Sequence, residues 1–443
     1  MSKFAPALGP TRSFISTLVA ESYDEELRIG DVVELEDESG HTPEGKVISL
    51  GAETKVRLRD GRVETLDVDA GEFYFVDRPS LRGLWETFLQ RGRPEGLALQ
   101  EAVDGALVAK LTAGFDALMN GRVDYHPGSG TIVRDLVHPS LYPHIDSAAQ
   151  SGETPTLDLW KRPYEASKYQ WLPTDFVVSE EGTVVVEGEI NNLPRSENEL
   201  MYAALAELFE QFVPLFESVA GYAEGLTLLD DSLEGEHELP EPPAKPVEAK
   251  VAPPQNLKGR RLQVITKIIE YKLEGDESFE GVWHVEGMSH ENILATGVYT
   301  LARDENLEGG ALRFKRPYTQ DDAGALFWNV AQCRPKVIEE MVDEAHIPLG
   351  SMETTDQQLF VFPNCHVHKL SKMSVAGGGT ARRRVVVFWL VHPDHRITGM
   401  DDVPPPQESM TFEAACVERL ALMEERRLHK QSHNVRSVSL CEH

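Results

Sequence analysis

The sequence has few cysteines and lacks any long apolar run. Its 443 residues include 4 cysteines, none of them in a C-x-x-C pair, so it offers neither a cysteine zinc site nor a disulfide framework. The longest apolar run, residues 385–391, is far shorter than the roughly 20 residues that cross a membrane. The N-terminal stretch MSKFAPALGPTRSF has no apolar core of signal-peptide length. We therefore expect a cytoplasmic protein with reduced thiols and no membrane partner.

Basic residues are also scarce. The chain has 43 Lys and Arg against 73 Asp and Glu, which gives a formal net charge of −30. Because phosphate contacts need a basic surface, this balance argues against nucleic acid and against an anionic membrane surface as partners. The hydrophobic share of 41% and the aromatic share of 8% are ordinary for a globular protein. The length allows two or three structural units with a large core.

The pattern of strands, helices and turns divides the chain into three parts. Residues 1–27 form a tail, residues 28–79 contain short β-rich segments separated by turn residues, and residues 80–443 form the main domain. Short strands at this spacing predict a small SH3-like β-barrel, which either offers a protein-contact surface or packs passively on the main domain. Residues 229–256 are rich in proline and poor in apolar side chains, so we expect a disordered or extended loop there.

The main domain mixes helical and β-rich patterns. An apolar repeat at three- and four-residue spacing predicts helix through residues 80–121. Ser196 and Glu199 fit a capping box at the start of another helix, which Pro214 should kink. Further elements are expected as a hairpin at 175–190, strands at 262–273, 281–288, 293–302, 311–314, 359–364 and 383–391, and a helix at 411–429. These elements favour an α+β domain with a sheet sandwich or barrel at its centre.

Residues 283–288, WHVEGM, supply the first candidate for chemistry. In a strand, side chains two positions apart point to the same face, so His284 and Glu286 could share one ligand. One neutral imidazole and one carboxylate are two of the three ligands in the facial triad that holds non-haem Fe(II).

Two other pairs, His144/Asp146 and His392/Asp394, have the same spacing. A chain of this composition should contain a few such pairs by chance, so we interpret these two as background. The pair at 284 differs because candidate partners follow it along the chain.

Those partners are histidines and arginines near the C-terminal strands. Either His366 or His368 could complete the metal ligands. Three arginines at 382–384 then open the apolar strand 385–391. A guanidinium at the start of a buried strand is costly to desolvate unless an anion meets it. A dicarboxylic cosubstrate would supply that anion and could bind the guanidinium through two hydrogen bonds.

This order of His-x-acid, His-x-aliphatic and Arg resembles the iron(II)- and 2-oxoglutarate-dependent dioxygenases of the double-stranded β-helix fold. Longer motifs resemble a single family, a domain of unknown function common in fungi, over roughly residues 80–410. The motifs that carry this resemblance are residues 125–129 (YHPGS), 134–143 (RDLVHPSLYP), 171–176 (WLPTDF), 190–193 (INNL) and 283–288 (WHVEGM).

The resemblance implies a fold and a set of roles. It implies a double-stranded β-helix core of the jelly-roll or cupin kind with flanking helices. It also implies that His284, Glu286 and His368 hold Fe(II) and carry the catalysis. Arg383, which precedes the aromatic Trp389 by six positions on the same strand face, would bind 2-oxoglutarate. O2 would be the second cosubstrate, and hydroxylation of a C–H bond with release of succinate is the expected outcome.

The substrate itself is expected to be a small molecule or an amino-acid-like compound. Side chains that could line its pocket, but could equally serve turns, caps or buried hydrogen bonds, are Arg134, Asn191, Asn192, Gln263 and Lys267. Two alternatives to the oxygenase remain open. One is a metal-binding cupin-type protein without 2-oxoglutarate chemistry, and the other is a non-catalytic binding protein that uses the N-terminal barrel.

Overall fold

The structure, a computed structural model, describes residues 4–8, 26–35, 43–68, 73–89, 94–150, 167–226, 251–319, 322 and 346–433. Cys333, Cys441 and residues 227–250, which hold most of the predicted proline-rich loop, lie outside the described residues. In the described part of the chain, no helix is both long and apolar enough to cross a membrane. The fold is mixed α+β and is built around one large antiparallel sheet.

The large sheet has nine strands in the order β1-β7-β19-β15-β22-β13-β11-β12, with β8 also pairing with β13. Its strands are β1 (Phe4–Ala5), β7 (Ala98–Gln100), β8 (Val133–Val137), β11 (Thr174–Val178), β12 (Val184–Glu187), β13 (Arg261–Glu274), β15 (Ile293–Arg303), β19 (Leu359–Pro363) and β22 (Thr380–Val391). The two longest strands, β13 and β22, pair with each other near the centre. Both are rich in β-branched residues and apolar on both faces, as expected for strands that are covered on each side.

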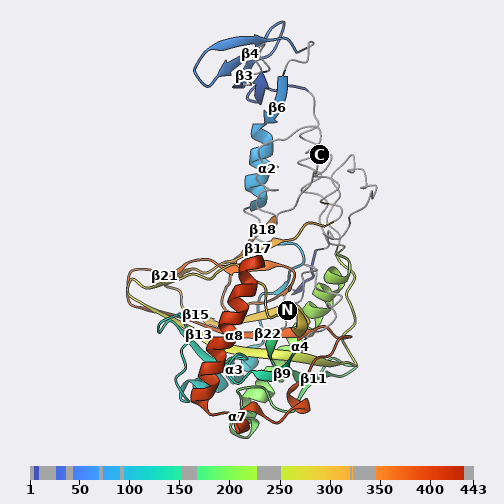
Figure 1. Cartoon of the computed structure of the whole chain (residues 1–443), viewed down its shortest axis with the longest axis vertical. Helices are drawn as coiled ribbons and strands as arrows, with labels where there is room; N and C mark the ends of the chain where they lie inside the picture. Colours follow the sequence, from blue (N-terminus) through green and yellow to red (C-terminus); the bar gives the residue numbers. More distant parts are fainter. Residues whose placement is uncertain are drawn as a thin grey trace.

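Different elements cover the two faces of the large sheet. One face packs against α3 (Gly105–Met119) and α4 (Arg195–Glu224), where Phe388 of β22 meets aromatic rings of α4 edge-on. The opposite face, which carries Trp389, packs against two small sheets and α8 (Phe412–His433). Figure 1 shows α8 lying across the strands of the large sheet. Arg383 lies on this second face, on the same side of β22 as Trp389.

The small sheets and the remaining short elements complete the main body. One small sheet has the order β18-β17-β20, and the other has the order β14-β21-β16. Their strands are β14 (Ser278–Phe279), β16 (Leu307–Gly309), β17 (Leu312–Arg316), β18 (Ile347–Met352), β20 (Val367–Leu370) and β21 (Met373–Val375). The other short elements are the paired strands β9 (His144–Gln150) and β10 (Ser167–Gln170), the 3-10 helices η1 (Ser289–Glu291) and η2 (Met400–Asp402), and α7 (Pro406–Ser409).

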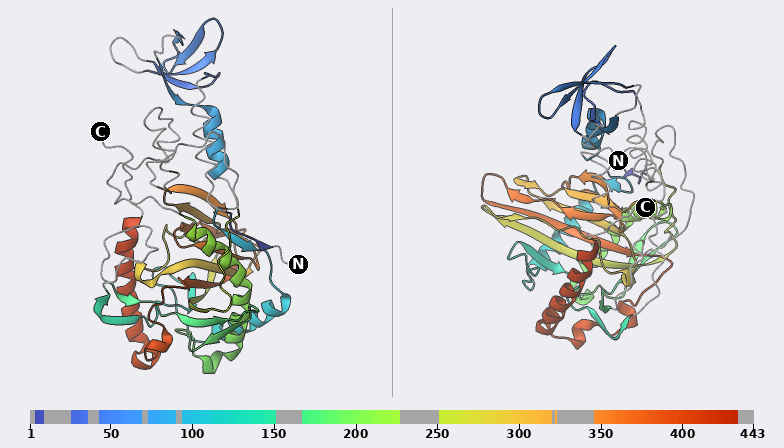
Figure 2. Two further views of the ribbon diagram at one scale, coloured as in Figure 1. Left: turned by 90° about the vertical axis from the view of Figure 1, so that its right-hand side faces the viewer. Right: turned by 45° about the horizontal axis from the view of Figure 1, so that its top comes forward.

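The N-terminal strands form their own five-stranded sheet, in the order β5-β4-β3-β2-β6. They are β2 (Val32–Leu35), β3 (Glu44–Ser49), β4 (Thr54–Leu58), β5 (Val63–Leu66) and β6 (Phe73–Asp77), followed directly by α2 (Pro79–Leu89). A buried ion pair between Arg78 and Asp31, with Nη2 and Oδ2 3.1 Å apart, ties the sheet to the start of α2. Figures 1 and 2 show this sheet and α2 projecting from the body that holds the large sheet.

The predicted closure of this sheet into an SH3-like barrel is not seen. Among the strand pairs that the structure describes, β5 and β6 are the two ends of the sheet and do not pair with each other. Alternation and turn spacing predicted the five strands, but closure depends on the twist of the whole sheet, which these local signals do not report.

The apolar repeat within residues 80–121 was misleading at one position. Instead of one continuous helical region, α2 and α3 flank β7, which pairs with β19 in the large sheet. Leu99 fits the spacing of the helical repeat, yet it lies in a strand because this segment pairs with β19. Tertiary pairing therefore overrides a local periodicity here.

The start of α4 also differs from the prediction. The N-cap position is Pro194, which makes no side-chain capping bond, so the predicted capping box at Ser196 is wrong. The residue with non-helical dihedrals is Asn198, and the helix continues through Pro214. The predicted hairpin, now β11 and β12, and the terminal helix α8 are confirmed.

Candidate metal centre

Residues 281–288 form a loop rather than the predicted strand. Only His284 pairs, in an isolated bridge with His368 of β20. In this bridge the His284 N–H donates to the His368 carbonyl at 3.0 Å, and the His368 N–H donates to the His284 carbonyl at 2.9 Å. The bridge joins two residues that are 84 positions apart in the sequence and places their side chains together.

The three predicted ligands converge on one another. Nε2 of His284 lies 3.5 Å from Oε1 of Glu286, and Nε2 of His368 lies 3.3 Å from the same oxygen. Nδ1 of His284 faces the Val282 carbonyl at 2.7 Å, and Nδ1 of His368 faces the His366 carbonyl at 3.3 Å. A carbonyl only accepts hydrogen bonds, so Nδ1 carries the proton of each neutral ring. The lone pair of each Nε2 therefore points toward the Glu286 carboxylate.

Asn364, in the turn between β19 and β20, holds the main chain of Glu286. The Glu286 N–H donates to Oδ1 of Asn364 at 2.9 Å, and Nδ2 of Asn364 donates to the Glu286 carbonyl at 2.9 Å. The sequence prediction missed this residue, although it lies only four positions before His368. Burial raises the pKa of Glu286, but the nearby rings of His284 and His368 outweigh burial and hold that pKa well below its ordinary value. Glu286 is therefore a carboxylate at neutral pH.

His366, the alternative third ligand, has a different environment. Its side chain is fully buried, and its Nε2 lies 3.3 Å from the hydroxyl of Tyr222 on α4. That hydroxyl donates to Glu95 at 3.1 Å, and Glu95 also pairs with the buried Arg316. Burial lowers the pKa of His366 to about 3, so the ring is neutral. The structure thus brings His368, and not His366, to the other two predicted ligands.

Arg383 is a buried cation without a carboxylate partner among the described residues. It is 3% exposed, and its Nε and Nη1 have no hydrogen-bond partner in the part of the chain that the structure describes. Burial lowers the pKa of Arg383 to about 10, so the guanidinium still carries its charge at neutral pH. A buried charge of this kind is costly unless an anion compensates it.

The neighbours of Arg383 reinforce this need for an anion. Arg303 of β15 is opposite Arg383 in the strand register, and its positive charge also lowers the pKa of Arg383. The Tyr271 ring lies 6.0 Å from the Arg383 guanidinium. Arg384 lies on the other face of the sheet, where it pairs with Glu270 at 2.9 Å, as the strand alternation predicts. Arg382 is exposed.

A row of buried polar atoms continues from Arg383 along the same face. Thr300, Thr296 and Trp389 each carry a buried polar atom with no hydrogen-bond partner among the described residues. Thr296 pairs with Trp389 on one side and with Phe362 on the other, and the Phe362 ring lies 4.7 Å from the His368 ring. This sequence of contacts places the metal-ligand group and Arg383 on one face of the large sheet.

Comparison with protein families identifies the chain. The sequence profile of a family described as "Protein of unknown function (DUF4246)" matches residues 98–414. The chain belongs to this family. The match covers all three predicted ligands and Arg383, and it confirms the family expected from the motifs. No curated protein matches this DUF4246 member.

Solved structures with a distant likeness to this DUF4246 member include the following three. IDO from Bacillus thuringiensis is 7% identical, covers 67% of this chain and 90% of its own, and has a TM-score of 0.32. A 2OG-Fe(II) oxygenase family oxidoreductase from Burkholderia pseudomallei is 14% identical over 32% of this chain and 47% of its own, with a TM-score of 0.19. A prolyl hydroxylase from Trichoplax adhaerens is 7% identical over 67% and 83%, with a TM-score of 0.27. At these TM-scores the likenesses carry no functional argument.

Most of the predicted pocket-lining residues of this DUF4246 member have structural partners. Arg134 donates to the Met119 carbonyl at the end of α3, and Asn191 donates to the Tyr142 carbonyl. Gln263 both donates to and accepts from the main chain of Ile397, at 2.7 and 2.8 Å. Asn192 adopts a left-handed turn conformation with φ of 65°. Lys267 differs, because its charge acts on Asp135 and His138.

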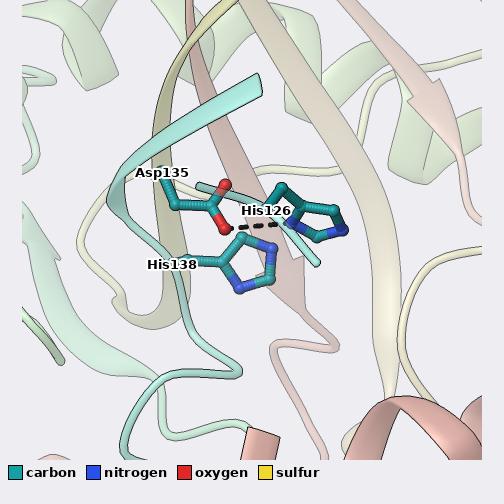
Figure 3. A group of neighbouring side chains, drawn as sticks. All are labelled: His126, Asp135 and His138. Atoms are coloured by element: carbon teal, nitrogen blue, oxygen red, sulfur yellow. Dashed lines mark hydrogen bonds and ion pairs between the residues drawn. The ribbon is translucent and has the colours of Figure 1, made fainter. Parts of the chain in front are cut away.

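A second group of metal-ligand residue types was not predicted. His126, Asp135 and His138 place one donor atom each within 4.8 Å of the others. Figure 3 shows the three side chains pointing toward one another, with Nδ1 of His126 2.9 Å from Oδ2 of Asp135. All three residues lie in motifs that signalled the family, but none of them forms the His-x-acid pair that predicted the first group.

Proposed function

We propose that the protein is an Fe(II)- and 2-oxoglutarate-dependent oxygenase. It would hydroxylate a C–H bond of a small or amino-acid-like substrate with O2, while 2-oxoglutarate is converted to succinate and CO2. Its core would be a double-stranded β-helix in which the large sheet and the small sheets are the opposing layers. The observation that carries the proposal is the convergence of His284, Glu286 and His368 on the face that also holds the buried Arg383.

The donor set suits ferrous iron. Two neutral imidazoles and one carboxylate on one side of a metal leave the other coordination positions open for cosubstrates. Ligand atoms bound at about 2.1 Å and at right angles lie about 3 Å apart, which is close to the 3.3 and 3.5 Å between the imidazoles and Glu286. When bound, the iron would supply the centre at which O2 and 2-oxoglutarate react.

The protein's own residues would orient the metal ligands and the cosubstrate. The carbonyls of Val282 and His366 fix the ring tautomers of the two histidines, and Asn364 fixes the main chain of Glu286. Such outer partners raise metal affinity because the ligands need no reordering on binding. Arg383 would pair with the distal carboxylate of 2-oxoglutarate through two charge-assisted hydrogen bonds.

Aromatic side chains would keep water away from one side of the metal. The ring of Phe362 lies 4.7 Å from the ring of His368, and the ring of Phe314 lies 6.3 Å from it. Both phenylalanines are almost fully buried. A dry wall of this kind strengthens the electrostatic attraction between the metal and its anionic cosubstrate.

An anaerobic titration tests the proposal. The 443-residue chain receives Fe(II) and then 2-oxoglutarate, and the weak visible charge-transfer absorption of the iron–2-oxoglutarate chelate is recorded. We expect saturable absorption in the wild type, none in His368→Ala, and unchanged absorption in the control Arg382→Ala, which alters an exposed arginine. Succinate release under air provides a second readout.

Two outcomes would contradict the oxygenase. If Fe(II) binds but neither the absorption nor 2-oxoglutarate consumption appears, the metal-binding cupin-type alternative is favoured. If Fe(II) does not bind at all, the binding-protein alternative is favoured.

A further inference from the structure

We propose that His126, Asp135 and His138 form a second divalent metal site, suited to a zinc-type ion. Two imidazole nitrogens and one carboxylate oxygen would bind the ion, and a further position would remain for water or another ligand. This site is distinct from the candidate iron centre, and the proposal does not depend on the proposed function.

The main chain preorganises the three side chains. The segment from His126 to Asp135 folds back on itself, with Tyr125 and Arg134 forming a bridge. The His126 N–H donates to the Val133 carbonyl, and the Asp135 N–H donates to the Asp124 carbonyl, both at 2.9 Å. Asp135 belongs to β8, which pairs with β13, so one ligand stands on the large sheet itself. The main-chain hydrogen bonds therefore hold the three donor atoms close together.

Burial supplies the second argument for a bound cation. The side chain of Asp135 is fully buried, and its Oδ1 has no hydrogen-bond partner in the described part of the chain. His138 is 4% exposed, whereas the side chain of His126 is 26% exposed and gives an ion a route to the group. A buried carboxylate with one unsatisfied oxygen costs free energy that a metal ion would recover.

The surrounding charges leave Asp135 available to a metal. Arg419 of α8 binds Asp124 through two hydrogen bonds, at 2.6 and 2.9 Å, and lies farther from Asp135, at 3.6 Å. Its charge is thus matched mainly by Asp124. Lys267 is the other cation that acts on Asp135, and it reduces the attraction for a second positive charge without occupying the donor atoms.

Metal binding has a cost at His138. The Ser140 N–H donates to Nδ1 of His138 at 3.1 Å, so the proton of the neutral ring sits on Nε2, the nitrogen left for a ligand. Binding at Nε2 moves that proton to Nδ1 and breaks the Ser140 hydrogen bond. We therefore expect a site weaker than a structural zinc site but still saturable in the micromolar range, roughly a Kd of 1–100 μM.

Zinc stoichiometry in the wild type and three variants tests the proposal. The metal-free 443-residue chain is dialysed against Zn²⁺, and bound zinc is measured by elemental analysis, with thermal melting as a check of folding. His368→Ala disables the first group and should retain one zinc per chain. The double variant His126→Gln/His368→Ala should retain none, because Gln can still donate to Asp135 but cannot replace the imidazole ligand. His144→Ala/His368→Ala is the matched control and should behave like His368→Ala alone, and wild type should bind two.

The outcomes separate this proposal from a purely structural group. Loss of zinc with the His126→Gln change, while melting of the metal-free protein stays the same, supports the site. If His368→Ala binds no zinc, the three side chains form a hydrogen-bonded cluster only. If the His126→Gln double variant keeps its zinc, the ion binds elsewhere. Neither contrary result bears on Fe(II) or 2-oxoglutarate binding at the first group.

Discussion

The two His–acid–His groups contain nearly the same residue types but use their ring nitrogens differently. In the group of His284, Glu286 and His368, each Nδ1 faces a main-chain carbonyl, and both Nε2 atoms point at the carboxylate. In the second group, Nδ1 of His126 is hydrogen-bonded to Asp135 and Nδ1 of His138 accepts from the Ser140 amide. The partner of the second nitrogen therefore decides how readily a histidine becomes a ligand.

Removing one ligand from each group should give the largest difference between the two groups. We expect His368→Ala to lose Fe(II) binding and all succinate release, because changes to outer partners alone already cost about 10–100-fold in metal affinity. His126→Gln should leave both unchanged. Iron content after anaerobic reconstitution and succinate release measure the two effects. Equal loss of iron from both variants would mean that the groups do not act separately.

The Arg383→Ala variant tests whether Arg383 binds the anionic cosubstrate 2-oxoglutarate beside the first group. Truncating one partner of a buried charge pair costs about 2–5 kcal/mol, so Arg383→Ala should raise the 2-oxoglutarate requirement about 30-fold to several thousand-fold. Iron content should change little. Lys at this position should restore only part of the affinity, because an ammonium cannot form the two parallel hydrogen bonds.

Succinate release against 2-oxoglutarate concentration measures this effect. Arg382→Ala, at an exposed neighbour, is the control and should leave the curve in place. A shift in the control with none in Arg383→Ala would show that Arg382, and not Arg383, binds the cosubstrate.

Asn364 tests whether a residue that holds the main chain of a metal ligand affects Fe(II) affinity. Asn364→Ala removes both hydrogen bonds to the Glu286 main chain, and we expect Fe(II) affinity to fall about 10–100-fold. Gln263→Ala is a matched control, since it removes an equivalent pair of hydrogen bonds to Ile397. Fe(II) titration of both variants gives the result. Equal weakening in both would indicate a general loss of stability rather than ligand positioning.

The pH dependence of stability gives the smallest effect and concerns the second group. Burial lowers the pKa of His138 well below its ordinary value of 6.5 in the metal-free protein. The unfolded chain then binds a proton below about pH 6.5 that the folded chain does not, so the free energy of unfolding falls as pH is lowered. The slope is at most about 1.4 kcal/mol per pH unit for this residue. Urea unfolding between pH 7 and pH 5 should show a shallower slope for His138→Gln than for wild type, and identical slopes would contradict it.

Much of the fold could be predicted because its signals are local. The runs that became β13, β15 and β22, the β11–β12 hairpin and α8 follow from β-branched composition, turn residues and apolar periodicity. The misses depend on distant partners. β7 became a strand because β19 offered an edge, and the segment around His284 stayed a loop because only one residue of it reaches β20.

In the candidate site, too, residues with a sequence pattern were predicted and residues that depend on distant partners were missed. His284, Glu286 and His368 have a recognisable order in the sequence, and the structure brings them together. Asn364 left no signal, because an asparagine in a turn usually serves the turn itself. The group of His126, Asp135 and His138 was missed because it contains no His-x-acid pair, and its convergence depends on how the chain folds back before β8.

The bridge between His284 and His368 has a consequence for the order of assembly. Closing a loop costs free energy that grows with the logarithm of its length, and this bridge spans 84 residues against 12 for His126 to His138. The difference is about 1.7 kcal/mol in favour of the shorter loop. The short-range group can therefore form early during folding, whereas the long-range group waits for the large sheet. Iron would then bind to a chain that has already folded, because the three ligands of a nascent chain are not yet close together.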